Sequence, residues 1–153
     1  MTIEIRILHS GDEALLINAA AEVFDNPVDA DRTREFLADP RHHIAVAIDN
    51  DLVVGFASGV HYIHPDKAPE LWINEVAVAP THRHCGLGKA VLQALLGVGR
   101  AHDCTVGWVL TYRNNPAAMA LYASLGGIEG ADTSGPNDAL LGYSFPLSNS
   151  TQE

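Results

Sequence analysis

The stretch from residue 72 to residue 91 constrains the fold of this chain most strongly. It runs from an apolar strand, through a loop that holds Gly86 and Gly88, directly into an apolar helix. Glycine lets the backbone turn tightly and approach a ligand closely, and the positive end of the helix dipole favours an anion such as a diphosphate. Arg83 and Lys89 would add positive charge. The segment predicts a strand–loop–helix unit of an α/β fold with an anion-binding loop.

The two glycines also have a purely structural explanation, because helix starts use glycine for turning and packing. The dinucleotide-binding pattern is missing, since no acidic residue follows a second strand at the required distance. The Walker pattern Gly-x-x-x-x-Gly-Lys is missing too. Spacing alone therefore leaves anion binding and a structural turn both open.

The rest of the chain alternates between strand and helix patterns. Apolar patterning predicts strands at residues 2–9, 44–48, 52–60, 70–78, 105–111 and 140–147. Helical spacing predicts helices at residues 14–24, 31–38, 86–102 and 116–125, and Ser10 and Glu13 have capping-box spacing before the first. We therefore expect a single α/β domain over residues 1–147, with a mixed, mostly antiparallel sheet flanked by helices, and a loose tail at residues 148–153.

The charge of the chain limits its partners. Nine Lys and Arg against nineteen Asp and Glu give 153 residues a formal net charge of −10. Residues 1–75 hold fourteen acids and five bases, whereas residues 76–153 hold five acids and four bases. Such a field repels phosphate polymers and anionic membranes, so we expect neither nucleic acid nor membrane as a partner. A merely solvated surface also explains the acidity.

The sequence also indicates a compartment. The N-terminus has acidic residues where a signal peptide needs a basic start, and no window approaches eighteen apolar residues. Two cysteines, Cys85 and Cys104, do not form a disulfide framework. We therefore expect a cytoplasmic protein.

Two motifs resemble a known family. The loop Arg83-His84-Cys85-Gly86-Leu87-Gly88 is similar to motif A of the GNAT superfamily of N-acetyltransferases, which reads Gln/Arg-x-x-Gly-x-Gly/Ala. Residues 115–126 resemble the family's helix Asn-x-x-Ala-x-x-x-Tyr-x-x-x-Gly. The likeness extends from Val53 to Gly127 and implies a GNAT-like acyl-CoA N-acyltransferase fold that uses acetyl-CoA as co-substrate.

The resemblance also implies which residues bind that co-substrate. The strand before the loop would pair its backbone with the pantetheine and acetyl groups, and the loop amides would hold the pyrophosphate. The implied binding residues are Val76, Ala77, Val78, Arg83, His84, Cys85, Gly86, Leu87, Gly88, Lys89, Asn115 and Ala118.

The sequence departs from the family at two places. His84 and Cys85 stand where relatives often have basic residues, so phosphate binding would depend more on backbone amides. The usual Leu-Gly-Phe after the tyrosine helix is Leu-Gly-Gly at residues 125–127, and we expect Ile128 to fill the core position of the missing phenylalanine.

Two residues are candidates for moving protons. Tyr122 matches the family's general acid, which would protonate the departing thiolate, and a core aromatic residue is its structural alternative. Glu75 precedes the motif A strand and could accept the amine's proton directly or through water. Strand alternation predicts that Glu75 faces the same side as Ile73 and Ala77. An acid at a solvated sheet edge is the alternative for Glu75.

The eight histidines do not show the spacing of a zinc site. We weighed His61 with His64, His82 with His84, and His42 with His43. None of these pairs belongs to a His/Cys/carboxylate constellation, and direct acetyl transfer needs no metal. We therefore expect no metal.

The amine acceptor is indicated by a closer resemblance and by charge. Residues 70–78, residues 115–122 and residues 19–24 resemble segments of the aminoglycoside 3-N-acetyltransferases of this superfamily. Aminoglycosides are polycations, which the acidic first half would attract, and acetylation would confer resistance. We expect Asp25, Glu70, Asn74 and Glu75 to bind the acceptor, with Asp29, Asp31 and Asp66 adding acidity.

Alternative functions stay open at this point. The acceptor could be another amine, such as a polyamine or a peptide N-terminus, or the chain could be a non-catalytic acyl-CoA sensor. Relatives are often dimers, so a homodimer that pairs through residues 132–147 is a further alternative.

Overall fold

A computed structural model describes residues 2–130 and 140–148. Within these residues one seven-stranded sheet has the order β1-β2-β3-β4-β5-β7-β6, antiparallel except between β4 and β5. The mixed, mostly antiparallel sheet is therefore confirmed. The strands are β1 (Glu4–Ile7), β2 (His42–Asp49), β3 (Leu52–Tyr62), β4 (Glu70–Val78), β5 (Val106–Tyr112), β6 (Ile128–Glu129) and β7 (Leu140–Pro146).

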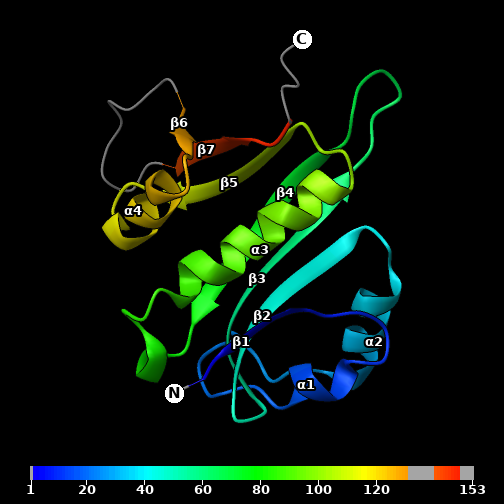
Figure 1. Ribbon diagram of the computed structural model, residues 1–153, viewed down its shortest axis with the longest axis vertical. Coiled ribbons are helices and arrows are strands. Elements are labelled where there is room, and N and C mark those ends of the chain that lie inside the picture. The colour runs from blue at the N-terminus through cyan, green and yellow to red at the C-terminus, as the bar shows by residue number, and fades with distance from the viewer. Residues whose placement is uncertain (1, 131–139, 149–153) are drawn as a thin grey trace.

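Helices cover both faces of the sheet (Figure 1). On one face, the ring of Phe24, which precedes α2 (Ala30–Ala38), stacks on Phe56 of β3 at 4.3 Å between centroids. On the other face, a Cβ added at Gly59 would lie 3.4 Å from Cδ2 of Leu95, which belongs to the long helix α3 (Leu87–Ala101). The remaining elements are α1 (Glu13–Ile17), the 3₁₀ turn η1 (Pro80–His82) and α4 (Pro116–Ser124). No helix among the described residues is both long and apolar enough to cross a membrane.

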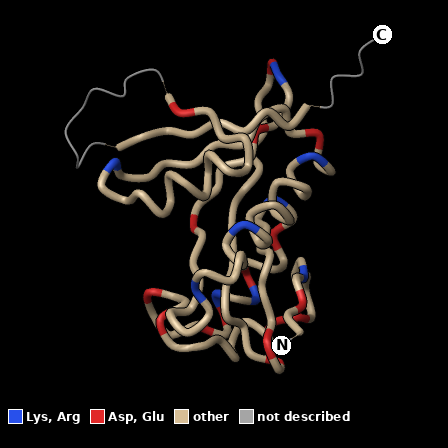
Figure 2. Tube along the Cα trace, turned by 60° about the vertical axis from the view of Figure 1, so that its left-hand side comes forward, with Lys and Arg blue, Asp and Glu red and all other residues tan. Residues whose placement is uncertain are grey.

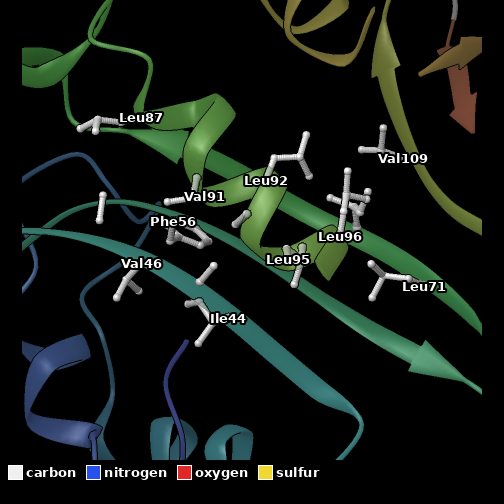
Figure 3. Packing of buried hydrophobic residues seen from close by; sticks show 14 of the residues in the cluster. Ile44, Val46, Phe56, Leu71, Leu87, Val91, Leu92, Leu95, Leu96 and Val109 are labelled. Carbon is white, nitrogen blue, oxygen red and sulfur yellow. The ribbon is translucent and has the colours of Figure 1, made fainter. Parts of the chain in front are cut away.

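The main core lies between α3 and the sheet. Figure 3 shows the buried side chains of α3 against the strands, and each is at most 7% exposed. Burying a leucine or valine stabilises a fold by about 1.5–3 kcal/mol relative to exposure, so this face of α3 anchors the strand that precedes it. The side chains are Leu87, Val91, Leu92, Leu95 and Leu96.

The first predicted helix is much shorter than its sequence pattern. Residues 14–24 were expected to be helical, but α1 ends at Ile17. The Asn18 carbonyl accepts a hydrogen bond from the Val53 amide at 3.1 Å, and the Ala20 amide donates to the Val53 carbonyl at 2.8 Å. Because these backbone groups form hydrogen bonds with β3, the alanine-rich segment runs beside the sheet instead of continuing as a helix.

The predicted capping box is wrong as well. The N-cap of α1 is Asp12, whose carboxylate accepts a hydrogen bond from the His9 amide at 2.9 Å. The Ser10 hydroxyl donates instead to the Leu37 carbonyl at 3.1 Å, and the Glu13 carboxylate accepts from the Gly11 amide. The Glu13 carboxylate therefore stabilises the turn before α1, and the Ser10 hydroxyl stabilises the contact of this turn with α2.

Ile128 does not fill the core position left by the missing phenylalanine. It lies on the short strand β6, which the sequence did not predict, and is 57% exposed. A side chain at Gly127 would place its Cβ 2.9 Å from Cε1 of Phe145 and 2.7 Å from the Tyr122 carbonyl. Phe145 of β7 already occupies that space, which explains why glycine stands at this position.

β4 and β5 separate soon after they meet. They pair in parallel at Leu71 with Gly107 and at Trp72 with Trp108, where the two tryptophan rings pack edge to face at 4.3 Å. Beyond these positions the described residues provide no further strand pairing between β4 and β5, and Figure 1 shows the two strands diverging. Among the described residues, the edge of β4 from Ile73 to Val78 therefore has no strand partner on the β5 side and could pair with an extended ligand, although the Val78 carbonyl accepts a hydrogen bond from Nε of Arg83 at 3.5 Å.

Candidate active site

A β-bulge turns Glu75 away from the core. Ser58 of β3 pairs with Glu75, whereas the next residue, Gly59, pairs with Ile73, so Asn74 is an extra residue in β4. Directly paired residues share a face of the sheet, and Gly59 faces α3. Glu75 therefore lies on the face opposite to Ile73. The prediction that these two share a face was wrong, because the bulge interrupts the alternation.

Asn74 and Glu75 line a pocket of about 310 Å³ on the face opposite α3. The pocket includes Asp25, which confirms that the fold brings together three of the four residues expected to bind the acceptor. Its other walls are mostly apolar, with Asp29 and Arg32 at the start of α2. The apolar residues are Leu16, Phe24, Pro27, Val28, Phe36, Ile44 and Phe56.

The acidic groups of this pocket influence one another. Although the Glu75 residue is exposed as a whole, partial desolvation in the pocket and, to a smaller extent, the negative charge of Asp25 raise the pKa of its carboxyl above the ordinary value. A raised pKa makes a carboxylate a better proton acceptor near neutral pH. Asp29 is partly committed elsewhere, because its Oδ1 caps α2 by accepting a hydrogen bond from the Arg32 amide at 2.8 Å.

The acidity expected for the acceptor side is visible in the fold. Figure 2 shows most Asp and Glu positions in the lower part of the view, which the N-terminal half of the chain forms. Asp31 is exposed on α2, where it forms an ion pair with Arg34 at 3.0 Å. Such a distribution would favour approach of a cation toward the pocket.

Glu70 lies apart from this pocket. It begins β4, five residues before Glu75, and its Oε2 is 2.6 Å from Nε2 of His64. Tyr62 pairs with Glu70 across the strands, and its hydroxyl accepts a hydrogen bond from the Trp108 indole at 2.6 Å. The structure therefore places Glu70 in a separate polar and aromatic cluster, and it is not among the residues that line the acceptor pocket.

The glycine loop has the backbone geometry of an anion site. His84 and Gly86 both adopt positive φ, 62° and 77°, so the chain coils tightly before α3. Gly86 is the N-cap and supplies no side-chain oxygen, so the amides of Leu87, Gly88 and Lys89 begin the helix without intrahelical acceptors. Successive amides of this kind form a concave site for a phosphate.

The side chains around this loop divide into two groups. Arg83, His84, Cys85 and Lys89 are exposed, whereas Leu87 is buried and can offer only its backbone. At Gly88, an added Cβ would lie 3.6 Å from Leu121 of α4 and 3.8 Å from Val78 of β4. The loop, the free edge of β4 and α4 therefore meet at one place, although α4 comes nearly thirty residues later in the chain.

Tyr122 projects from α4 toward the last strand. Its ring packs against Tyr143 at 5.5 Å and against Phe145 at 6.3 Å between centroids. Burial raises the pKa of its phenol, which keeps the hydroxyl protonated at neutral pH. The structure shows no hydrogen bond from this hydroxyl to another described residue.

Asn115 and Ala118 form the N-terminal cap of α4. The Asn115 side chain accepts a hydrogen bond from the Ala118 amide at 3.1 Å, and Pro116 occupies the first helical turn. Capping of this kind stabilises a helix by about 1 kcal/mol. The spacing of these two residues therefore has a structural reason, and their contact with the co-substrate stays a prediction.

Arg32 is the cationic residue of the pocket, and the sequence had not indicated it; the polar residues Asn26, Thr33 and Ser58 also line the pocket without having been expected there. Arg32 lies in the first turn of α2 and lines the pocket together with Asp25 and Glu75. Helical spacing had indicated α2, but nothing in the sequence linked its first turn to a strand more than forty residues later. The pocket thus combines a cationic group with its acidic ones.

Comparisons with known proteins agree with this architecture. Residues 14–127 match the model of the acetyltransferase (GNAT) family. The L-2,4-diaminobutyric acid acetyltransferase of Nocardia farcinica is 35% identical over 78 residues, which are 51% of this chain and 39% of that protein. The chain therefore matches less than half of that relative's length.

Two solved structures are similar over nearly the whole chain. The Salmonella typhimurium protein yncA, solved with its cofactor acetyl-CoA, has a TM-score of 0.68 and 25% identity, covering 98% of this chain and 96% of that one. An aminoglycoside acetyltransferase from an uncultured soil metagenomic sample has a TM-score of 0.69 and 21% identity, covering 89% and 98%. At that identity the second likeness shows the fold alone.

Proposed function

The chain belongs to the GNAT family of acetyl-CoA-dependent N-acetyltransferases, and from this premise we propose that it acetylates a primary amine of a small polycationic acceptor held in the pocket of Glu75. One observation supports the acceptor class most directly: the carboxylates of Glu75 and Asp25 line the same largely apolar pocket. Two carboxylates near one another favour a cationic ligand with more than one ammonium group.

Glu75 is proposed as the general base. An ammonium ion must lose a proton before its nitrogen can attack, and the raised pKa of Glu75 suits it to accept that proton directly or through water. The bulge at Asn74 supports this role, because it turns the carboxylate from the core into the pocket. Glu75 then returns the proton to solvent.

Tyr122 is proposed as the general acid. Acetyl-CoA supplies a thioester, whose C–S bond breaks as the new C–N bond forms. The Tyr122 phenol would give its proton to the departing sulfur and regain one from solvent. Because burial raises its pKa, the phenol is protonated before transfer. Its place on α4, whose Leu121 lies beside Gly88 of the glycine loop, supports the role.

The co-substrate is proposed to lie between β4 and the glycine loop. The edge of β4 at Val76, Ala77 and Val78 would pair with the extended pantetheine, once the hydrogen bond from Arg83 to the Val78 carbonyl opens. The amides of the first turn of α3 would hold the pyrophosphate, with Arg83 and Lys89 adding charge from their exposed positions. Localisation in the cytoplasm and dimerisation through residues 132–147 stay predictions, and residues 132–139 lie outside the described residues.

Aminoglycosides are the acceptor class that we propose first. They carry several amino groups, and the acidic N-terminal half would attract them over a distance comparable to the Debye length. The 3-amino group is the expected site, in line with the resemblance of residues 70–78 to the strand of aminoglycoside 3-N-acetyltransferases.

A small diamino acid is a second candidate, and Arg32 is the observation that favours it. A diamino acid carries two ammonium groups and one carboxylate, and a guanidinium binds carboxylates in a bidentate manner. Arg32 lines the same pocket as Asp25 and Glu75. The Nocardia relative named for a diamino acid is consistent with this choice.

A thiol-release assay with acetyl-CoA tests the function and separates the candidates. The acceptor panel holds several aminoglycosides, short diamino acids, polyamines and peptides with free N-termini. Turnover with aminoglycosides supports the first candidate, and turnover with diamino acids that falls with Arg32→Gln supports the second. Tight CoA binding without turnover of any amine would refute the enzymatic role of the pocket.

Salt provides an independent check on electrostatic recruitment. Raising ionic strength should increase the apparent KM for a polycationic acceptor more than the KM for acetyl-CoA, because screening weakens long-range attraction to the acidic half. Equal effects on both constants would contradict recruitment by charge.

A further inference from the structure

Three histidines from three separate elements meet at the end of α3. They are His43 on β2, His61 on β3 and His102, the C-cap residue of α3. Each offers one ring nitrogen, and these nitrogens all lie within 4.8 Å of one another. Nε2 of His43 is 2.7 Å from Nδ1 of His61, and the rings of His61 and His102 stack at 4.6 Å between centroids.

The sheet register explains why these side chains converge. His43 pairs with Gly59, which faces α3, and His61 lies two residues beyond Gly59 on the same strand. Both imidazoles therefore project from the face of the sheet that α3 covers. His42, the neighbour of His43, projects from the opposite face, where its ring contacts Phe36 of α2.

We propose that His43, His61 and His102 form a binding site for a divalent transition metal of the zinc class. Three imidazole nitrogens and one open position, which water would fill, make a four-coordinate site. Zinc–nitrogen bonds of about 2.0–2.1 Å at tetrahedral angles separate two ligating nitrogens by roughly 3.3 Å. The observed separations range from 2.7 Å to within 4.8 Å, so metal binding would change them by up to about 1.5 Å through movement of the side chains.

The surroundings of the cluster also suit a cation. The C-terminal end of a helix carries partial negative charge, and His102 lies at this end of the fifteen-residue helix α3. His43 is buried, whereas His102 is exposed, so the cluster is open to solvent on one side. The positive charge of Arg41 and the negative charge of Asp39 both act on His61, and their electrostatic effects on this imidazole oppose each other.

This site is separate from the proposed chemistry. α3 spans about 22 Å at 1.5 Å per residue, with the glycine loop at its first turn and the histidine cluster at its last. The expectation of no metal considered histidines that are close in the sequence. His43, His61 and His102 are 18 and 41 residues apart, so only the fold brings them together.

The experiment titrates tag-free protein with Co²⁺ at pH 7.5 and follows the visible d–d absorption of four-coordinate cobalt, with Zn²⁺ as competitor. We expect one Co²⁺ per chain in the wild type. Because His102 is exposed, His102→Gln should leave the fold intact and weaken Co²⁺ binding by at least about tenfold. His61→Gln should have a similar effect.

His42→Gln is the matched control, because it removes a histidine next to His43 from the opposite face of the sheet. It should leave the affinity unchanged. Zn²⁺ should also raise the Tm of the wild type but not of His102→Gln. No cobalt absorption, equal affinity of wild type and His102→Gln, or an equal loss in His42→Gln would each overturn the proposal.

Discussion

Replacing Glu75 by glutamine tests the general base with little change in shape. The side chain is exposed in the pocket and makes no hydrogen bond to another described residue, so the free energy of unfolding should change by less than about 0.5 kcal/mol. General-base catalysis contributes roughly 10²–10⁴ in rate. Asp25 lies close enough to raise the pKa of Glu75, so it can partly replace the missing base. We therefore expect kcat to fall about a hundredfold, or roughly 2.7 kcal/mol in the barrier.

The assay is CoA-thiol release at saturating acetyl-CoA, measured for Glu75→Gln, Glu75→Gln with Asp25→Asn, and the control Glu35→Gln. Glu35 is an exposed acid of α2 outside the pocket of Glu75, so its variant controls for the loss of one negative charge. The double variant should lose more activity than Glu75→Gln. A decrease of less than threefold in both would refute the assignment of Glu75 as the base.

Four further tests address the pocket, the acid and the sheet. Because the base must be ionised and burial and Asp25 raise the pKa of Glu75, kcat/KM should fall on acidification at a pH above the ordinary range of a glutamate. Asp25→Asn should move this fall to lower pH, and an unmoved pH profile would contradict the coupling. Tyr122→Phe should reduce kcat about a hundredfold or more, with little change in the KM for acetyl-CoA or in Tm; a decrease of less than threefold would remove Tyr122 from the acid role. At Gly59, an alanine Cβ would lie 2.5 Å from the Trp72 carbonyl oxygen, so Gly59→Ala should cost about 1–3 kcal/mol and lower Tm by several degrees. Gly97→Ala, where nothing lies within 4 Å of the added Cβ, should not lower Tm, and equal behaviour of the two variants would contradict the clash.

The elements with strong local patterns were predictable from the sequence. The hairpin of β2 and β3 and the apolar stripe of α3 agree with the expected ranges to within a few residues. β2 and β3 are largely apolar on both faces and bury both, whereas α3 buries the stripe that its periodicity specifies. Their positions therefore did not depend on contacts made elsewhere in the chain.

The helix pattern of residues 14–24 failed for the opposite reason. The alanines after Asn18 favour a helix, but the Val53 backbone offers a donor and an acceptor that bind this segment to β3. A bond between residues more than thirty positions apart leaves no signal in helical periodicity.

The candidate residues could be named from the sequence, but their arrangement could not. The resemblance to the family's motifs pointed to Tyr122 and the glycine loop, and the place of Glu75 just before the motif A strand pointed to Glu75; their roles stay predictions. The bulge at Asn74, which decides the face of Glu75, depends on how β3 pairs with β4. The addition of Arg32 to the pocket and the separation of Glu70 from it likewise depend on the packing of α2 and on the partners of β4.

The short contact between β4 and β5 has a consequence for cooperativity. The sheet consists of two groups of strands, β1–β4 and β5, β7 and β6. Only the pairing at Leu71 and Trp72 joins them among the described residues, so few backbone hydrogen bonds connect the two groups. Local opening can then proceed in one group of strands before the other, because cooperative unfolding units follow contiguous contacts. An extended ligand that pairs along β4 would add backbone bonds where the sheet lacks them, so the two groups would open less independently when such a ligand is bound.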